Sequence, residues 1–95
     1  MKLWLDDIRI PPEGGWTWVT TVKDAIRCLE TGTVEEISFD HDLGTKDDGC
    51  DVAAWIEMMA AAEKMNRIKW SIHSANPVGR QRISQAMESA ERFWS

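Results

Sequence analysis

Residues 36–49 read EISFDHDLGTKDDG, in which a short apolar run leads into a crowd of acidic side chains. The run contains Ile and Phe and is closed by Asp40, so it predicts a strand whose carboxyl end carries a carboxylate. Asp42, Asp47 and Asp48 follow closely, and like charges held together repel one another. For Asp47 and Asp48, which stand directly before a glycine and a helical pattern, we expect helix capping and turn formation. Asp40, which stands directly at the end of the strand, is better explained by a binding site, as are Asp6 and Asp7 at the end of an earlier apolar run.

The rest of the chain alternates short apolar strands with helical patterns. Further strands are predicted over 2–5 (KLWL), 16–19 (WTWV) and 68–72 (IKWSI). Apolar residues at helical spacing follow the second, third and fourth strands: Val22, Ala25, Ile26 and Leu29; Val52, Trp55, Ile56 and Met59; and Ile83, Ala86, Met87, Ala90 and Trp94. We expect Thr20 or Thr21 to cap the first helix, and Asn76 followed by Pro77 to start the third.

The element order β-β-α-β-α-β-α indicates an α/β domain with a largely parallel sheet and helices on both of its faces. Residues 10–15 (IPPEGG) should form a loop, because two prolines and two glycines oppose helix and sheet alike. In open parallel sheets, ligands bind beyond the carboxyl ends of the strands. We therefore expect the functional residues at that edge of the sheet.

Composition limits the classes of protein to which this chain can belong. With 95 residues we expect one domain, residues 1–95, with one modest core. The net charge of −5 argues against binding an extended nucleic-acid duplex or an anionic membrane, although a single phosphate can still be held locally. The opening MKLWLDDIR reaches acids too early for a signal peptide and no apolar run could span a bilayer, so we expect a cytoplasmic protein. Cys28 and Cys50 show neither metal-binding nor redox spacing and are expected to be reduced thiols.

Three polar clusters fall at the carboxyl ends of the first, third and fourth predicted strands. They are Asp6, Asp7 and Arg9; Asp40, His41 and Asp42; and His73, Ser74 and Asn76. If these strands are parallel neighbours, the clusters face one pocket, in which converging carboxylates would repel one another. A divalent cation removes this repulsion, and hard oxygen ligands suit Mg²⁺, Mn²⁺ or Ca²⁺, of which we expect Mg²⁺ or Mn²⁺. We therefore expect a metal site formed by Asp6, Asp7, Asp40 and Asp42.

Both histidines of the chain fall in the same clusters. Imidazoles titrate near neutrality, so His41 and His73 could act as general base and general acid on either side of a phosphate, with Asp40 beside them. The segment after the fourth strand adds a helix N-terminus, which offers free amides to an anion. Hydrogen bonds and positive charge for the phosphate are expected from Arg9, Ser74, Asn76 and Arg80.

The same residues resemble the pattern of receiver domains of two-component response regulators. Receivers carry an acid pair after the first strand, an acceptor aspartate after the third and a Ser/Thr–Ala pair after the fourth, matched here by Asp6 and Asp7, by Asp40, and by Ser74 and Ala75. Receivers also have a fifth strand that ends in a functional lysine, for which this sequence shows no counterpart. The sequence is more similar to a cyclic-phosphate processing receiver-like family, whose signatures are matched by LDDIRIPP (5–12), SFDHDLG (38–44) and HSANPVG (73–79).

This resemblance implies a three-layer, receiver-like (flavodoxin-like) sandwich with a short, mainly parallel sheet of about four strands in the order 2-1-3-4. It places Asp6, Asp7 and Asp40 at a metal or polar core, and phosphate contacts at His41, His73, Ser74 and Asn76. The implied function is a phosphoesterase acting on a cyclic or terminal phosphate of a nucleotide or RNA end, with Mg²⁺ or Mn²⁺ as cofactor. Two alternatives stay open: a non-catalytic module that binds a phosphorylated nucleotide or a protein partner, and a phosphoacceptor at Asp40, against which the missing lysine argues.

Overall fold

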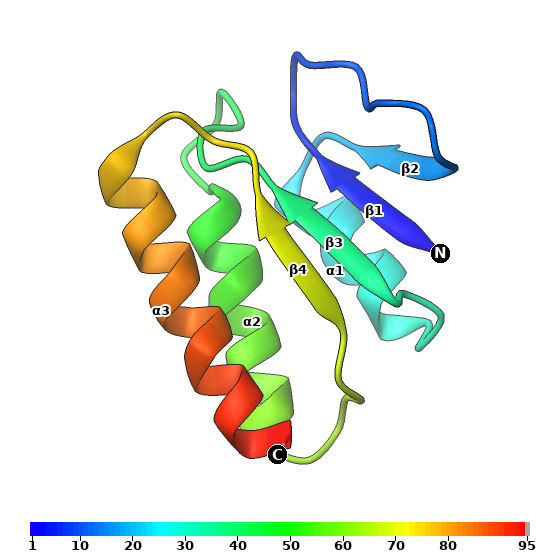
Figure 1. The fold of residues 1–95 in the computed structure, drawn as a ribbon, viewed down its shortest axis with the longest axis vertical. Coiled ribbons are helices and arrows are strands. Elements are labelled where there is room, and N and C mark those ends of the chain that lie inside the picture. Colours follow the sequence, from blue (N-terminus) through cyan, green and yellow to red (C-terminus); the bar gives the residue numbers. More distant parts are fainter. Residues whose placement is uncertain (95) are drawn as a thin grey trace.

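The computed structural model describes residues 1–94, and at its centre is a four-stranded sheet (Figure 1). The strands are β1 (Lys2–Leu5), β2 (Trp16–Val19), β3 (Glu36–Phe39) and β4 (Lys69–Ile72). Neighbouring strands all pair in parallel, in the order β2-β1-β3-β4. The predicted strand order and the receiver-like α/β fold are therefore confirmed.

A helix follows each of the last three strands: α1 (Val22–Glu30), α2 (Gly49–Ala61) and α3 (Pro77–Trp94). Thr21, Asp48 and Asn76 each accept a hydrogen bond from a backbone N–H in the first turn of the helix that they precede. These bonds satisfy donors that a helix start leaves free, so the predicted caps are confirmed. Within residues 1–94, no helix combines the length and the apolar content needed to cross a membrane.

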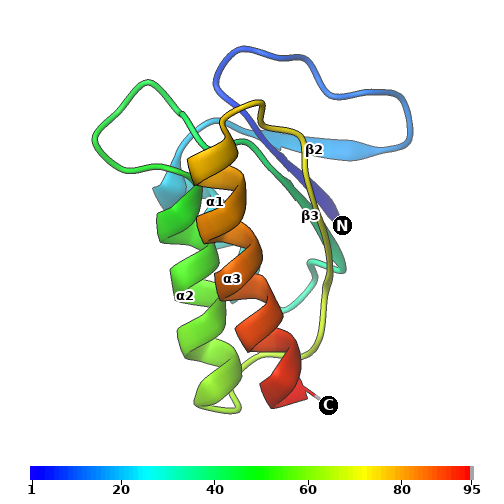
Figure 2. The same ribbon diagram turned by 60° about the vertical axis from the view of Figure 1, so that its left-hand side comes forward.

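All three helices lie on one face of the sheet, which Figure 2 shows from the side. The expectation of helices on both faces is therefore wrong, and the cause is the direction in which the chain steps across the sheet. From β2 to β3 and from β3 to β4 the chain moves the same way, so right-handed crossovers place α1 and α2 on the same face. Only the step from β1 to β2 runs the opposite way, and residues 6–15 make that step as a loop without a helix.

The helix-covered face of the sheet carries the hydrophobic core. Fully buried side chains of the sheet pack there against fully buried side chains of the helices: Leu3, Leu5, Ile37 and Phe39 against Val52, Ile56, Ile83 and Met87. Burying each of these side chains contributes roughly 1.5–3 kcal/mol. Because strand side chains alternate between faces, Trp4 and Ser38, which are partners in β1 and β3, point to the opposite face.

Candidate functional site

The register of the sheet brings Asp6, Asp40 and His73 side by side. Leu5 pairs with Phe39, and the ladder continues for one residue beyond these strand ends. The N–H of Asp40 donates to the carbonyl of Leu5 (2.9 Å) and the N–H of His73 to the carbonyl of Phe39 (2.9 Å). One ligand atom from each of the three side chains lies within 4.8 Å of the other two. Two carboxylates and an imidazole thus meet at the carboxyl edge of the sheet.

A pocket of about 400 Å³ opens at this edge. Three segments that are far apart in the sequence form its walls: Asp6, Asp7, Ile8 and Arg9; Asp40 and Asp42; and Ser74, Ala75 and Asn76. All of the predicted metal-binding aspartates line it, together with Arg9, Ser74 and Asn76 of the predicted phosphate-binding residues, whereas Arg80, His41 and His73 do not. The pocket therefore combines oxygen ligands with hydrogen-bond donors in one small space.

Asp6 is only 1% exposed, and both of its carboxylate oxygens accept hydrogen bonds. Oδ1 accepts from the backbone N–H groups of Ile8 (2.8 Å) and Arg9 (2.9 Å), and Oδ2 lies 3.0 Å from Nε2 of His73. Burial by itself would raise the pKa of Asp6, but these hydrogen bonds outweigh it and hold the pKa below its ordinary value. Asp6 is therefore an ionised carboxylate at neutral pH.

Asp40 is nearly as buried and lies beside this negative charge. Burial raises the pKa of Asp40 above its ordinary value, and the charge of Asp6 raises it further. The N–H of His41 donates to Asp40 Oδ1 (2.9 Å), which favours the ionised form and offsets only part of the shift. The start of α2 packs closely against the backbone of this residue, since a Cβ on Gly49 would collide with the Asp40 carbonyl. Two crowded carboxylates of this kind create a place where a cation is favoured.

His73 is held by three neighbours that fix its position and protonation. Nε2 faces Asp6, Nδ1 lies 2.8 Å from Oγ of Ser38, and the ring stacks on Trp4 with centroids 3.8 Å apart and planes 3° apart. Burial lowers the pKa of His73 more than the neighbouring carboxylates raise it, so the ring is neutral at neutral pH. The tautomer that fits donates from Nε2 to Asp6 and accepts the Ser38 hydroxyl at Nδ1.

Ser38 and Trp4 were missed by the sequence reasoning, although a signal for both exists. Each stands two residues before an aspartate of the site, Ser38 before Asp40 and Trp4 before Asp6. Side chains two residues apart in a strand share a face, so both were bound to lie beneath the carboxylates.

His41 lies in a second cluster, at the starts of α2 and α3. Its Nε2 is 3.1 Å from Oδ2 of Asp48, and its Nδ1 is 3.4 Å from Nδ2 of Asn76. A Cβ on Gly79 would collide with the His41 ring, so α3 can approach the ring only because this position is glycine. The thiol of Cys50 lies in the same cluster. Burial raises the pKa of Cys50 to about 11, with the charge of Asp48 adding to the shift, so the thiol keeps its proton at neutral pH.

The two imidazoles therefore belong to different clusters, and within residues 1–94 neither ring lines the pocket. Side-chain alternation explains the separation. His73 is level with Asp40 in the ladder, whereas His41 is one residue further along and points toward the helices. The expected arrangement, with one ring on either side of a single phosphate, is not the arrangement that the structure has.

Arg9 and Arg80 also take different places. Arg9 lines the pocket with a half-exposed side chain and donates from Nη1 to the carbonyl of His73 (3.0 Å). Arg80 donates from Nη1 to the carbonyls of Ile72 (3.1 Å) and Ser74 (2.9 Å), and it is not part of the pocket wall. Arg9 thus presents its guanidinium to the pocket, whereas Arg80 holds the chain that leaves β4.

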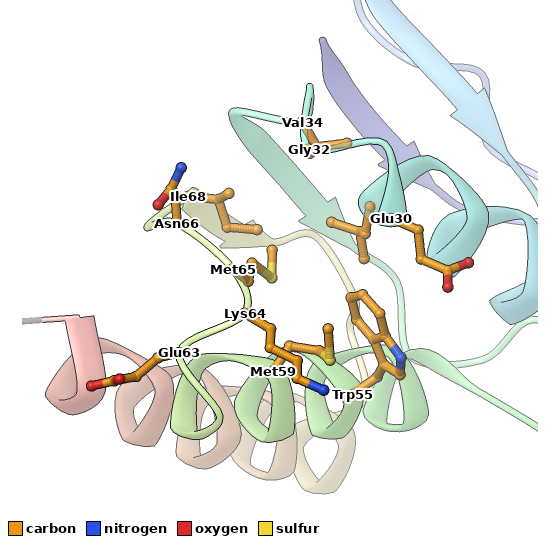
Figure 3. A pocket seen from close by; sticks show the side chains of 11 residues that line it. Glu30, Gly32, Val34, Trp55, Met59, Glu63, Lys64, Met65, Asn66 and Ile68 are labelled. Atoms are coloured by element: carbon orange, nitrogen blue, oxygen red, sulfur yellow. The ribbon is translucent and has the colours of Figure 1, made fainter.

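A second cavity, of about 450 Å³, lies away from these residues, between α1, α2 and the segment before β4 (Figure 3). Trp55, Met59, Met65 and Ile68 gather around it. No His, Cys or Asp of residues 1–94 lines this cavity. Its lining offers packing surface and little chemistry, so the candidate site is the carboxylate pocket.

Comparison with known proteins identifies the family of the chain. A family model described as the cyclic-phosphate processing receiver domain matches residues 1–89 of the 95. The match includes every segment that lines the carboxylate pocket. Searches of curated proteins and of solved structures found no significant match. The chain therefore belongs to the family of cyclic-phosphate processing receiver domains.

Proposed function

We propose that this domain is a phosphoesterase that acts on a cyclic or terminal phosphate of a nucleotide or RNA end. The observation that supports the proposal most is the pocket of about 400 Å³ in which carboxylates and hydrogen-bond donors from three loops meet. This volume is at the lower end of the range for small-molecule sites. It suits a phosphate with its attached sugar and excludes a helical duplex.

The carboxylate oxygens in the pocket are the kind of ligand that a hard divalent cation prefers. Asp6 and Asp40 place carboxylate oxygens within 4.8 Å of one another, and burial together with the repulsion from Asp6 raises the pKa of Asp40. Asp7 and Asp42 add two more carboxylates to the same wall. In the proposal Asp6, Asp7, Asp40 and Asp42 hold Mg²⁺ or Mn²⁺. The bound ion would supply positive charge to the phosphate as negative charge develops on its oxygens.

The other residues of the pocket bind and orient the phosphate. Arg9 brings a guanidinium to the pocket wall, and Asn76 and Ser74 bring polar side chains from the loop after β4. In this proposal the histidines are positioning residues. His73 holds the Asp6 carboxylate through Nε2, and His41 restrains the Asn76 amide through Nδ1. A direct role in proton transfer would require either ring to leave these partners.

The proposal is tested by incubating the protein with 2′,3′-cyclic nucleotides and with ADP-ribose cyclic phosphate in Mg²⁺, in Mn²⁺ and in EDTA. Chromatography should show a phosphomonoester product in the presence of metal and none in EDTA. Asp7→Asn should reduce the rate strongly. Asp47→Asn, which makes the same change of charge at an exposed residue outside the pocket, should not. No turnover of any substrate in either metal would remove the enzymatic function.

A second candidate function is a non-catalytic module that binds the same phosphorylated ligands. One observation favours it: each imidazole already contacts a protein partner through both of its nitrogens. This candidate predicts saturable binding of a cyclic nucleotide, measured by calorimetry, with the ligand recovered unchanged. Arg9→Ala should weaken binding under either function, whereas only the enzyme forms product.

A further inference from the structure

We propose that His41, Asp48 and Cys50 form a second metal site, separate from the carboxylate pocket and suited to a thiophilic divalent cation such as Zn²⁺. The three residues are brought together by the fold, since His41 follows β3 whereas Asp48 and Cys50 belong to the start of α2. One ligand atom of each lies within 4.8 Å of the other two. The spacing of the two cysteines along the chain gives no hint of this site.

The distances match what Zn²⁺ requires after a small adjustment. Nε2 of His41 is 3.1 Å from Oδ2 of Asp48, and the edge between nitrogen and oxygen ligands in a tetrahedral zinc site is about 3.3 Å. The edge to a thiolate sulfur is about 3.6 Å, and the sulfur lies within 4.8 Å of the other two ligand atoms, so the Cys50 side chain needs to close by at most about 1.2 Å. Both His41 and Asp48 are partly exposed, which leaves a path for the ion and a fourth position for water.

The donor set separates this site from the one at Asp40. Imidazole, thiolate and carboxylate together select Zn²⁺ or Co²⁺ over Mg²⁺, which prefers oxygen ligands. Binding forms a bond from the metal to the Cys50 sulfur and releases the thiol proton to solvent. Asp48 can contribute Oδ2 without uncapping α2, because its Oδ1 accepts the N–H of Cys50 (2.8 Å).

A metal ion bound at this site would also affect the carboxylate pocket, through Asn76. A metal on Nε2 places the ring proton of His41 on Nδ1, which faces the Asn76 amide nitrogen at 3.4 Å. The amide must then turn, and Asn76 is part of the pocket wall. Zn²⁺ at His41 is therefore expected to change the affinity of the pocket for phosphate.

Cobalt provides the test, since a Co²⁺–thiolate bond gives a charge-transfer band in the near ultraviolet. The folded wild-type protein titrated with Co²⁺ should show this band, saturating at one equivalent, bleached by Zn²⁺ and retained in excess Mg²⁺. Cys50→Ser should abolish the band. Cys28→Ser is the matched control, because Cys28 lies on α1 outside the cluster, and it should keep the band.

Asp48→Asn retains a good helix cap and should weaken Co²⁺ binding by roughly tenfold or more, which keeps the test decisive if Cys50→Ser folds poorly. Asp7→Asn should leave the band unchanged, since Asp7 belongs to the carboxylate pocket. The absence of a thiolate band in wild-type protein at saturating Co²⁺ overturns the site. A band that survives Cys50→Ser, or that is unaffected by Asp48→Asn, overturns it equally.

Discussion

Replacing Asp40 with asparagine removes one of the two carboxylates that crowd the end of the sheet, and it should stabilise the metal-free protein. Carboxylate oxygens of Asp6 and Asp40 lie within 4.8 Å of one another. Two unit charges at that separation repel by about 1–3.5 kcal/mol for effective dielectric constants between about 80 and 20. The pKa of Asp40 is raised in the folded protein, so the ionised form is the disfavoured one and a neutral side chain gains stability.

Asparagine keeps an oxygen that can accept the N–H of His41, so that hydrogen bond survives the change. Arg9 lowers the pKa of Asp40 and so offsets part of the repulsion. We therefore expect a gain near the lower end, about 1 kcal/mol, or a rise in Tm of about 4–8 °C for a domain of this size. In the presence of metal, wild-type protein should be the more stable of the two, because Asp40→Asn lacks one of the proposed metal ligands.

The assay is thermal unfolding, followed by circular dichroism, in EDTA and in Mg²⁺. Wild-type protein should gain stability from Mg²⁺ and Asp40→Asn should not. Asp47→Asn makes the same change of charge in the exposed part of the loop and should shift stability by less than about 0.5 kcal/mol in either condition. The reasoning is refuted if Asp40→Asn is the less stable protein in EDTA, or if Mg²⁺ stabilises both proteins equally.

Three further predictions concern the residues behind the pocket. Ser38→Ala removes the hydroxyl that hydrogen-bonds Nδ1 of His73 and should lower the free energy of unfolding in urea by about 1–3 kcal/mol. Ser71→Ala, at the paired and exposed position of β4, should lower it by less than about 0.5 kcal/mol. Equal losses would contradict the hydrogen bond. Gly79→Ala should destabilise the protein because the added methyl group meets the His41 ring, even though alanine favours a helix over glycine by about 1 kcal/mol. A higher denaturation midpoint for this variant would show that the ring lies elsewhere. The pKa of His73 is lowered from 6.5 in the folded state, so the unfolded chain takes up the proton first and stability should fall as the pH drops below about 6.5. His73→Gln should make the free energy of unfolding less dependent on pH in this range. An unchanged pH dependence would count against a buried neutral ring.

The strands, the helix caps and the convergence of the carboxylates could be predicted because their signals are local. Asp6 and Asp40 each close a short apolar run, and parallel strands bring their carboxyl ends to one edge whatever the details of packing. Thr21 and Asp48 precede helical patterns at positions where their oxygens meet free N–H groups.

The two wrong predictions have one cause: each concerned the side of the sheet on which a helix or a side chain lies. Helices were expected on both faces, yet the order β2-β1-β3-β4 with right-handed crossovers already requires α1 and α2 on one face. His41 and His73 were expected to face one phosphate, yet they differ by one residue in register relative to Asp40 and so point to opposite sides. Both facts follow from the topology once it is known.

The approach of Cys50 to His41 could not have been foreseen in the same way. It depends on how closely α2 and α3 pack at their starts, where Gly79 leaves room for the imidazole. Neither the spacing of the cysteines nor the periodicity of the helices carries that information.

The proposed phosphoesterase function of the carboxylate pocket is tested most directly by a phosphorus NMR time course of a 2′,3′-cyclic nucleotide mixed with the protein in Mg²⁺. The cyclic phosphate signal should be replaced by that of a phosphomonoester with wild-type protein, and it should persist with Asp40→Asn and with wild-type protein in EDTA. A signal that stays unchanged with wild-type protein in both Mg²⁺ and Mn²⁺, or conversion by Asp40→Asn at the wild-type rate, would contradict a metal-assisted phosphoesterase at Asp6, Asp7 and Asp40.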